Sequence, residues 1–532
     1  MSGSRRTSRL VLILFFASGF AALLYQMVWQ RLLTLFGGAD VYSVTIIVAS
    51  FMAGLGFGSL AGGYVADRLG LRGRFLAFAG AELAIGLFAL VSVPLLHDVL
   101  YARIAPLALS RLATAGILLL TLLWPTFFMG MSLPLLAKAV SLRDSPPEAW
   151  IGTLYGANTL GAAAGSLVTA WVLARTVGFA RAVDCGVLLN LACAAGGFAM
   201  AARAPRLDPV EDRPQPTETP RGPIAPATFS FPTWTLVYAT SGFIALSLEI
   251  LWFRILGVIL KSNSFTFATL LAIYLMGVGG GALLGGRWAR RTARPGEAFL
   301  LLQTAVALYA GLSVALLTGA LGRTDVLDLL WHYLGDYEAL DVAVGLHDTL
   351  RFVIHGGRVA GLVQDQAFLF LTLYVVLPVA LIGVPTLLMG ASFSLLQRAT
   401  QTDPALVGRR VGGLQTANIA GSTVGTVVTG LGLLQVFGSA WTLKLLVLLG
   451  GVFPILLMRA RPNRPRLPVA ALGLALGVAW LAPDEATLWS RLHGSSTDDI
   501  VVAEDGSGLS ILRDHDQATS VFVNGLGQSE IP

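Results

Sequence analysis

Charged residues are scarce in this sequence. Asp, Glu, Lys and Arg make up only 12% of the 532 residues, whereas hydrophobic residues make up 55%. A soluble domain carries roughly a quarter charged residues, so this composition excludes a soluble globular protein. It instead predicts an all-α polytopic membrane protein whose main partner is the lipid bilayer.

Cysteine is nearly absent, since the sequence contains only Cys185 and Cys193. The two lie in one apolar segment and form no CxxC motif, which excludes a disulfide framework and favours two small buried side chains. His332, His347 and His355 fall in one polar stretch but lack the tight spacing of metal ligands. We therefore expect no metal site there, and a solvated loop instead.

The formal net charge of +6 raises the question of nucleic acid binding. The basic residues lie in short loops between apolar runs rather than on one face, which argues against a nucleic acid partner. The densest arginine clusters, at 5–9, 68–74 and 287–294, fall on one side of the membrane if the N-terminus is cytoplasmic. The positive-inside rule therefore predicts a multi-pass protein of the inner cell membrane with a cytoplasmic N-terminus.

Apolar runs long enough to cross a bilayer define the domain organisation. Six runs predict a first membrane repeat at residues 1–202, and six more predict a second repeat at 234–460. Residues 203–233 are rich in proline and charge, so we expect a disordered cytoplasmic linker. A shorter apolar segment at 461–483 either spans the bilayer or lies in its interface.

The two halves repeat one another in sequence. Residues 18–68 align without a gap with residues 241–291, and "PTFFMGMSLPLLAKA" from Pro125 matches "PTLLMGASFSLLQRA" from Pro385. Two long matches in the same order indicate a duplicated unit. Because each copy has an even number of spans, the repeats are parallel, as in major-facilitator transporters. The second copy carries an outer insertion at 322–365, with the spacing of amphipathic surface helices.

Gln26 and Glu249 occupy equivalent positions in the first and seventh spans. An ionisable group at that depth is costly unless it is paired or hydrated, so Glu249 is a candidate for binding a solute or a proton. The alternative is a structural hydrogen bond that fixes the register of two helices. The change from glutamine to glutamate breaks the symmetry of the halves, which suits a central site.

Other intramembrane polar residues occur in equivalent pairs, Arg31 with Arg254 and Asn158 with Asn418. Arg254 follows Glu249 by five residues, which places the two side chains roughly 140° apart around a helix and disfavours a direct pair. We therefore expect the partners of Glu249 and Arg254 to lie on other spans, where asparagines are available.

The stretch "GGYVADRLGLRGR", which begins at Gly62, resembles the loop between the second and third helices of major-facilitator transporters. In that family the loop helps to latch the two halves together. The matching residues are Gly63, Asp67, Arg68, Gly70 and Arg72. The equivalent stretch of the second half, "GGRWARRTARPG", lacks the aspartate.

Short β-rich runs follow residue 498 and are separated by Asp-Gly, Ser-Gly and Asn-Gly turn signals. They predict a small C-terminal β-hairpin fragment within residues 484–532. Two hairpins alone are marginally stable in water, so we expect this fragment to be the incomplete start of a larger β-rich domain.

Three phrases carry a family resemblance: "ASGFAALLYQMVWQRLL", "FMAGLGFGSLAGGYVADR" and, in the tail, "VFVNGLGQSEIP". They resemble the membrane-embedded spermidine synthase-like family, a fusion of a major-facilitator-like part and a spermidine synthase. The resemblance implies an aminopropyltransferase acting on a polyamine with decarboxylated S-adenosylmethionine, and it places Gln528 near the substrates. The family's nucleotide loop and catalytic aspartates do not occur before Pro532, so we expect a truncated, non-catalytic membrane half without a cofactor.

Two alternatives remain open at the level of sequence. The first is a major-facilitator-like transporter of a small solute, with a cation as one candidate, whose site lies between the halves and contains Glu249. The second is a membrane scaffold that only anchors an enzyme.

Overall fold

A computed structural model describes residues 2–38, 41–107, 109–140, 147–205, 229–261, 265–324, 327–515 and 518–531. The predicted disordered linker at 203–233 falls mostly on residues 206–228, which lie outside the described residues. Its two ends belong to the last helix of the first half and the first helix of the second half.

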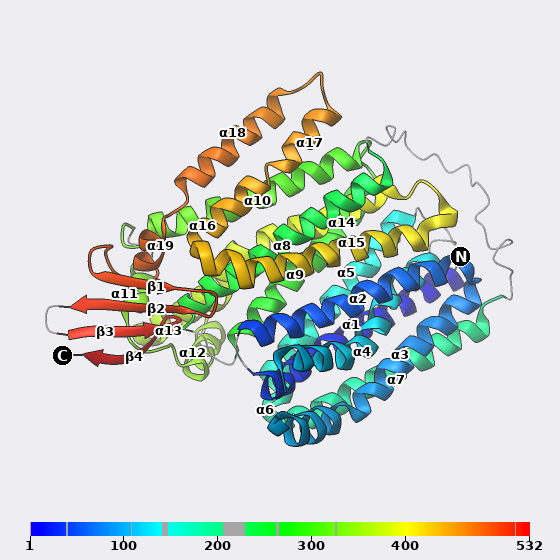
Figure 1. Cartoon of the computed structure of the whole chain (residues 1–532), viewed down its shortest axis with the longest axis horizontal. Helices are drawn as coiled ribbons and strands as arrows, with labels where there is room; N and C mark the ends of the chain where they lie inside the picture. The colour runs from blue at the N-terminus through cyan, green and yellow to red at the C-terminus, as the bar shows by residue number, and fades with distance from the viewer. Residues whose placement is uncertain are drawn as a thin grey trace.

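The first half is a bundle of long helices, drawn in blue to cyan in Figure 1. Two of the helices continue through π-helical segments, α3 through Pro94–Ile104 and α5 through Thr169–Leu173. The helices of this half are α1 (Ser2–Gly37), α2 (Val41–Arg68), α3 (Leu71–Val93), α4 (Arg111–Val140), α5 (Pro147–Val168), the short α6 (Ala174–Thr176) and α7 (Gly178–Arg203).

The second half repeats this arrangement, in green to orange. A π-helical segment at Thr429–Leu433 corresponds to the one at Thr169–Leu173 in the first half. The membrane helices of this half are α8 (Phe231–Ile259), α9 (Thr266–Ala289), α10 (Pro295–Ala320), α14 (Val384–Thr400), α15 (Val407–Val428), α16 (Leu434–Leu449) and α17 (Val452–Ala460).

Gly438 divides one very long apolar stretch into two crossings. The stretch Pro404–Ala460 has 57 residues, which as one straight helix would measure about 85 Å, nearly three times the hydrocarbon core of a bilayer. Gly438 breaks it with a φ of 67° and a ψ of −177°, a conformation that favours glycine. Gly178 has a φ of 79° and turns the chain at the equivalent place in the first half.

The described residues contain 11 stretches that are long and apolar enough to cross a membrane. With the division at Gly438, these stretches supply six crossings in each half. The predicted fold class, an all-α polytopic membrane protein built from two six-helix repeats with a small C-terminal β-structure, is therefore confirmed.

The duplication extends to individual hydrogen bonds. The Asn158 side-chain amide of α5 donates to the carbonyl of Phe15 in α1 at 3.0 Å, and the Asn418 amide of α15 donates to the carbonyl of Tyr238 in α8 at 3.2 Å. Both asparagines thus satisfy a polar group in lipid by bonding to the backbone of a neighbouring helix. These two residues fix helix positions and leave no side-chain amide directed at a solute.

After α17 the chain forms α18 (Arg466–Leu481), which packs against α10 and α16 and returns to the end of the molecule opposite the N-terminus (Figure 1). The chain then bends by 67° into α19 (Glu485–Arg491). At the same end lie the helices of the insertion, α11 (Asp328–Gly335), α12 (Val342–Ile354) and α13 (Gly361–Leu371), the last of which leads into α14.

The C-terminal strands form one antiparallel sheet in sequential order. Its buried face, which includes Leu509, Ile511 and Phe522, packs onto α11 and α19. The two helices supply the apolar contacts that two hairpins lack in water. We call the sheet, α11 and α19 together the outer cap, a name that denotes only their place at the end of the molecule opposite the N-terminus. The strands are β1 (Ile500–Glu504), β2 (Leu509–His515), β3 (Ala518–Val523) and β4 (Leu526–Ile531).

His493 lies at the centre of the outer cap. Its side chain is 1% exposed, it packs edge-on against Phe522 at 5.5 Å, and the Arg513 guanidinium donates to its carbonyl at 2.9 Å and to that of Gly335 at 2.7 Å. Burial, together with the nearby cations of Arg513 and Lys261, lowers the pKa of His493 from 6.5 to about 4, although a hydrogen bond from its ring to the backbone of α19 opposes the shift.

We predict that the outer cap loosens in acid. Because the folded cap keeps His493 neutral while the unfolded segment takes up a proton below pH 6.5, the stability that His493 contributes is complete above 6.5 and is lost as the pH falls towards 4. The expected slope is at most about 1.4 kcal/mol per pH unit. Hydrogen exchange of β1–β4 between pH 7.5 and 4.5 measures it, and His493→Gln should flatten this part of the profile. Equal profiles for the two proteins contradict the prediction.

Candidate functional site

Two helix pairs form the seams between the halves, α2 with α15 and α5 with α9. Along the first seam, the Thr416 hydroxyl donates to the carbonyl of Gly56 at 2.9 Å. Along the second, the Ser166 hydroxyl donates to the carbonyl of Ala268 at 3.1 Å and the Trp171 indole donates to the Thr269 hydroxyl at 3.0 Å. Both seams are closed along their length in this conformation.

Asp67 bridges the halves at the end of the molecule where the N-terminus lies. Its two carboxylate oxygens accept from the backbone N–H groups of Gly408 and Arg409, each at 2.9 Å, at the start of α15. Free N–H groups and the helix dipole make a helix N-terminus favourable for an anion. Lys138 of α4 completes the contact, since its ammonium lies 3.2 Å from Asp67 and donates to the carbonyl of Pro404 at 2.6 Å.

The remaining residues of the predicted latch loop differ in whether they contact the second half. Gly63 packs against the second half, where an added Cβ would lie 2.6 Å from the carbonyl oxygen of Gly408. Arg68 is exposed at the end of α2, Gly70 precedes the first residue of α3, and Arg72 lies in the first turn of α3. Within the loop, Gly63 and Asp67 are thus the residues that the structure places against the second half.

Glu249 of α8 accepts a hydrogen bond from the hydroxyl of Tyr274 in α9. In the gap-free alignment of the halves, Gln26 corresponds to Glu249 and Phe51 corresponds to Tyr274. Gln26 and Phe51 also lie together, because both line one small cavity of about 10 Å³. Where the first half has an amide and a phenyl ring, the second half therefore has a carboxyl group and the hydroxyl that bonds to it.

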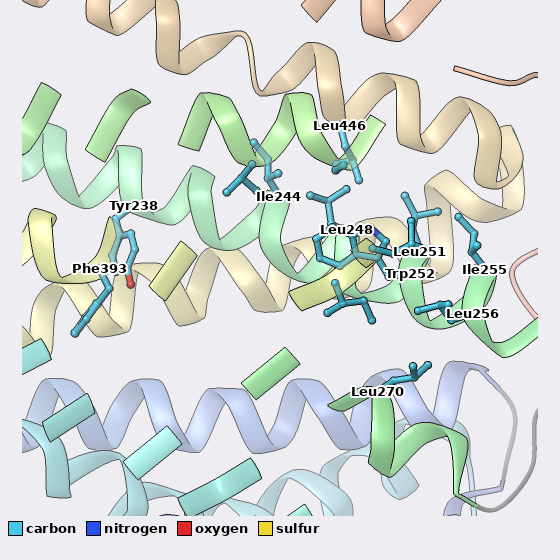
Figure 2. Packing of buried hydrophobic residues seen from close by; sticks show 14 of the residues in the cluster. Tyr238, Ile244, Leu248, Leu251, Trp252, Ile255, Leu256, Leu270, Phe393 and Leu446 are labelled. Atoms are coloured by element: carbon cyan, nitrogen blue, oxygen red, sulfur yellow. The ribbon is translucent and has the colours of Figure 1, made fainter. Parts of the chain in front are cut away.

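Aromatic side chains surround this pair and connect it to the first half. Tyr155 of α5 packs on Phe393 of α14 at 4.3 Å between ring centres, and Phe393 lies 6.4 Å from Tyr238 of α8. Figure 2 shows Tyr238 and Phe393 side by side at one end of the apolar face of α8. Tyr155 and Tyr238 both lie close enough to Tyr274 to interact with it electrostatically. The pair thus lies beside a cluster that crosses between the halves.

The expectation that Arg254 pairs with another membrane span is wrong. Its guanidinium Nε lies 3.1 Å from the carboxylate of Glu504 in β1, and Nη2 donates to the carbonyls of Asp505 and Gly508 at 2.6 Å each. The partners come from the first hairpin of the C-terminal sheet, because the outer end of α8 reaches the outer cap. Arg31, the equivalent residue of the first half, is exposed.

Gln528 lies on β4, the edge strand of the sheet, and its side chain is exposed. It is therefore far in structure from Glu249 and Asp67, and the structure does not gather the predicted polar residues into one site. Asp67 and Gly63 lie at one end, Glu249 lies at the interface of the halves, and Arg254 lies beneath the outer cap.

Glu82 of α3 is a buried carboxyl group that the sequence analysis did not single out. It is 0% exposed and accepts from the Ser18 hydroxyl at 2.6 Å, the Asn190 amide at 2.7 Å and the Ser132 hydroxyl at 3.4 Å, which join α1, α4 and α7 to α3. A lone acidic residue in the apolar run 75–96 was the available signal.

In the second half, a neutral glutamine amide contacts the serine that corresponds to Ser132. The Gln303 amide of α10 donates to the Ser392 hydroxyl at 2.7 Å, and Ser392 is the repeat partner of Ser132. Each half therefore has one carboxyl and one amide among these four side chains, in opposite order: Gln26 and Glu82 in the first half, Glu249 and Gln303 in the second.

No protein-family model matches the chain, and no curated protein matches it in sequence. Solved structures do match it in fold. A bacterial homologue of the iron transporter ferroportin, in an outward-facing state with soaked iron, is 8% identical, with a TM-score of 0.53 over 86% of this chain and 99% of that chain. The human organic anion transporter MFSD10 (TETRAN) is 15% identical, with a TM-score of 0.50 over 86% of this chain and 99% of that chain.

These comparisons correct the resemblance drawn from the sequence. The solved neighbours are transporters of the major-facilitator type, and nothing among them points to a spermidine synthase-like fusion, a polyamine or a transferase. The phrases that suggested that family are mostly apolar helix segments rich in glycine, a composition that helix packing in lipid favours generally. The chain is a multi-pass membrane protein with the major-facilitator fold.

Proposed function

We propose that this chain moves a small cationic solute across the membrane, and that Glu249 and Tyr274 contact the solute between the two halves. The observation that carries the proposal is the pair itself, a carboxyl group and its hydrogen-bond donor in the second half only, beside aromatic residues that cross the interface. An ionisable residue within a membrane bundle is a functional candidate because its burial is costly.

The carboxylate and the aromatic rings favour a cation over an anion. Glu249 supplies the counter-charge once it has lost its proton, and the faces of Tyr155, Tyr238 and Phe393 offer the negative quadrupole that attracts organic cations. The names of the structural neighbours include both iron and organic anions, so the neighbours do not select a solute. The choice of a cation rests on the residues of this chain.

Movement of a solute past Glu249 requires one end of the interface to open. In the present conformation hydrogen bonds close both seams, and Asp67 and Lys138 add a charged contact at one end. In transporters with parallel repeats, rigid rocking of one half against the other exposes a central site to each side in turn. We assign the Asp67 end to the cytoplasm of an inner membrane protein, on the basis of the arginine clusters near it.

We predict that the double variant Glu249→Gln, Tyr274→Phe abolishes uptake without unfolding the protein. It gives the second half the same two residues that the first half has at Gln26 and Phe51, a pair that the fold already accommodates. Uptake of radiolabelled methylammonium into proteoliposomes should fall to the level of empty vesicles, while the size-exclusion profile and the melting temperature stay close to those of the wild type.

The matched control is Glu530→Gln, which removes one carboxylate from the exposed edge strand β4. It should leave uptake unchanged. A role for Glu249 and Tyr274 would be contradicted if the double variant took up methylammonium at the wild-type rate. The variant must have a wild-type size-exclusion profile and melting temperature for this comparison. Wild-type uptake no faster than that of empty vesicles, tested across methylammonium, tetramethylammonium and choline, would contradict the proposed function itself.

We predict that Asp67→Asn opens the cytoplasmic end. The variant loses a charge that accepts two backbone hydrogen bonds and contacts Lys138. Charged hydrogen bonds contribute about 1.5–3 kcal/mol each, so the open fraction should rise roughly tenfold or more. The rate at which a membrane-impermeant thiol reagent labels Thr416→Cys, in a background without Cys185 and Cys193, measures the opening.

Asp403 supplies the control for this experiment. Its carboxylate accepts from the backbone N–H of Ala405 at 2.8 Å, within the second half, and its charge acts on Lys138 of the first half. Asp403→Asn therefore removes the same charge near the same seam without removing the hydrogen bonds that Asp67 makes between the halves. Labelling should stay near the wild-type rate. Equal labelling of Asp67→Asn and Asp403→Asn would show that Asp67 does not hold the halves together.

A further inference from the structure

A cavity of about 440 Å³ opens at the outer end of the second half, where α16, α19 and β1 meet. It is lined by Gln435, Val436, Phe437, Gly438, Trp441, Glu485 and Glu504. None of these residues belongs to the interface that contains Glu249 and Tyr274. The cavity lies beneath the outer cap, on the side of the membrane that we assign to the exterior.

Two carboxylates converge on the turn at Gly438. A Cβ added to Gly438 would lie 3.1 Å from Glu504 Oε2 and 3.4 Å from Glu485 Oε2, so the missing side chain leaves space between the two acids. A φ of 67° further disfavours any other residue at this position. The turn therefore keeps both acidic groups facing one open volume.

Glu504 is held in place by donors of its own. Its side chain is fully buried and accepts from the backbone N–H of Ser439 at 3.0 Å and from the Trp489 indole at 2.7 Å, in addition to its ion pair with Arg254. The protein itself thus supplies the partners of this carboxylate. Glu504 therefore lines the cavity with a side chain held in place by its own partners.

Glu485 has no such compensation. Among the described residues, its carboxylate has no hydrogen-bond or ion-pair partner, and burial, followed by the nearby charge of Glu504, raises its pKa, which the Arg254 charge opposes. Asp484, Asp505 and Lys444 lie near this region but do not line the cavity. Four carboxylates and two cations, Arg254 and Lys444, therefore act at or near the cavity, and the surplus charge is negative.

Aromatic side chains form the opposite wall of the cavity. Phe437 is 46% exposed and Trp441 is 55% exposed, so the protein covers each ring only in part. The Lys444 ammonium lies 4.9 Å from the centre of the Trp441 ring, which shows that this ring already attracts a cation. A carboxylate together with open aromatic faces is the combination that binds alkylammonium groups.

We propose that this cavity is a binding site for a small organic ammonium ion, with Glu485 as its counter-charge and Phe437 and Trp441 as its aromatic wall. The site is separate from the proposed transport path, and its occupancy is an equilibrium that requires no movement of the halves. A bound cation would bridge α16 and α19 and thereby tie the outer cap to the second half.

The test is isothermal titration of tetramethylammonium chloride into the full chain in lipid nanodiscs, with sodium chloride of equal concentration as the reference. The titrations are repeated in the Glu249→Gln, Tyr274→Phe background, so that binding at the central pair does not contribute. We expect saturable binding of tetramethylammonium to the Glu249→Gln, Tyr274→Phe protein. In that protein, Glu485→Gln or Trp441→Leu should each weaken the affinity by about tenfold or more. Loss of a charge or cation–π contact of about 1.4 kcal/mol changes affinity tenfold.

Glu530→Gln is the matched control, because it removes one carboxylate from the same side of the protein without touching the cavity. It should bind tetramethylammonium as the background does. Binding that is not saturable, or that persists unchanged in both Glu485→Gln and Trp441→Leu, would overturn the proposal. Such a result would leave the uptake experiments on Glu249 unaffected, so the two ideas fail separately.

Discussion

Close approach of helix backbones at the two seams is the constraint on which the rest of the structure depends. An added Cβ on Gly63 would lie 2.6 Å from the carbonyl oxygen of Gly408, and one on Gly156 would lie 2.8 Å from that of Gly279. In lipid the hydrophobic effect does not drive helices together, so contacts of this kind and hydrogen bonds between helices supply the association. The halves therefore meet along narrow surfaces of small residues, which permit one half to move against the other.

The two halves share the arrangement of their membrane helices but differ in their polar side chains. The first half has its buried carboxyl at Glu82, enclosed by three donors from neighbouring helices, whereas the second has its carboxyl at Glu249, beside the interface. Glu82 stabilises the helix bundle of the first half, whereas Glu249 lies beside an aromatic cluster to which both halves contribute. The outer cap adds a further asymmetry, because Arg254 binds the C-terminal sheet while Arg31 stays exposed.

The sequence was sufficient for the architecture because hydrophobic length and internal repetition are local properties. Spans, the duplication and the exchange of Gln26 for Glu249 were all predicted from short stretches of residues. The partner of Arg254 was not, because it lies about 250 residues further along the chain and no pattern links the two segments. Tyr274 was missed because a change from phenylalanine to tyrosine alters one atom that matters only beside Glu249.

The family resemblance failed for a related physical reason. Its two membrane phrases describe how helices pack in lipid, and such packing is shared by membrane proteins of unrelated activity. The packing of the C-terminal strands against helices could likewise not be predicted from the sequence. Strands that are marginal alone become part of the protein when α11 and α19 cover one face of the sheet.

The most direct test of alternating access is a pair of distances measured by double electron–electron resonance. One pair of spin labels, at Arg68→Cys and Arg409→Cys, spans the seam at the Asp67 end of the molecule. The other pair, at Val172→Cys and Phe267→Cys, spans the seam at the opposite end, and all four side chains are exposed. The account predicts two populations at each seam that change in opposite directions when methylammonium is added. A single distance at both seams, unchanged by the cation, would contradict it.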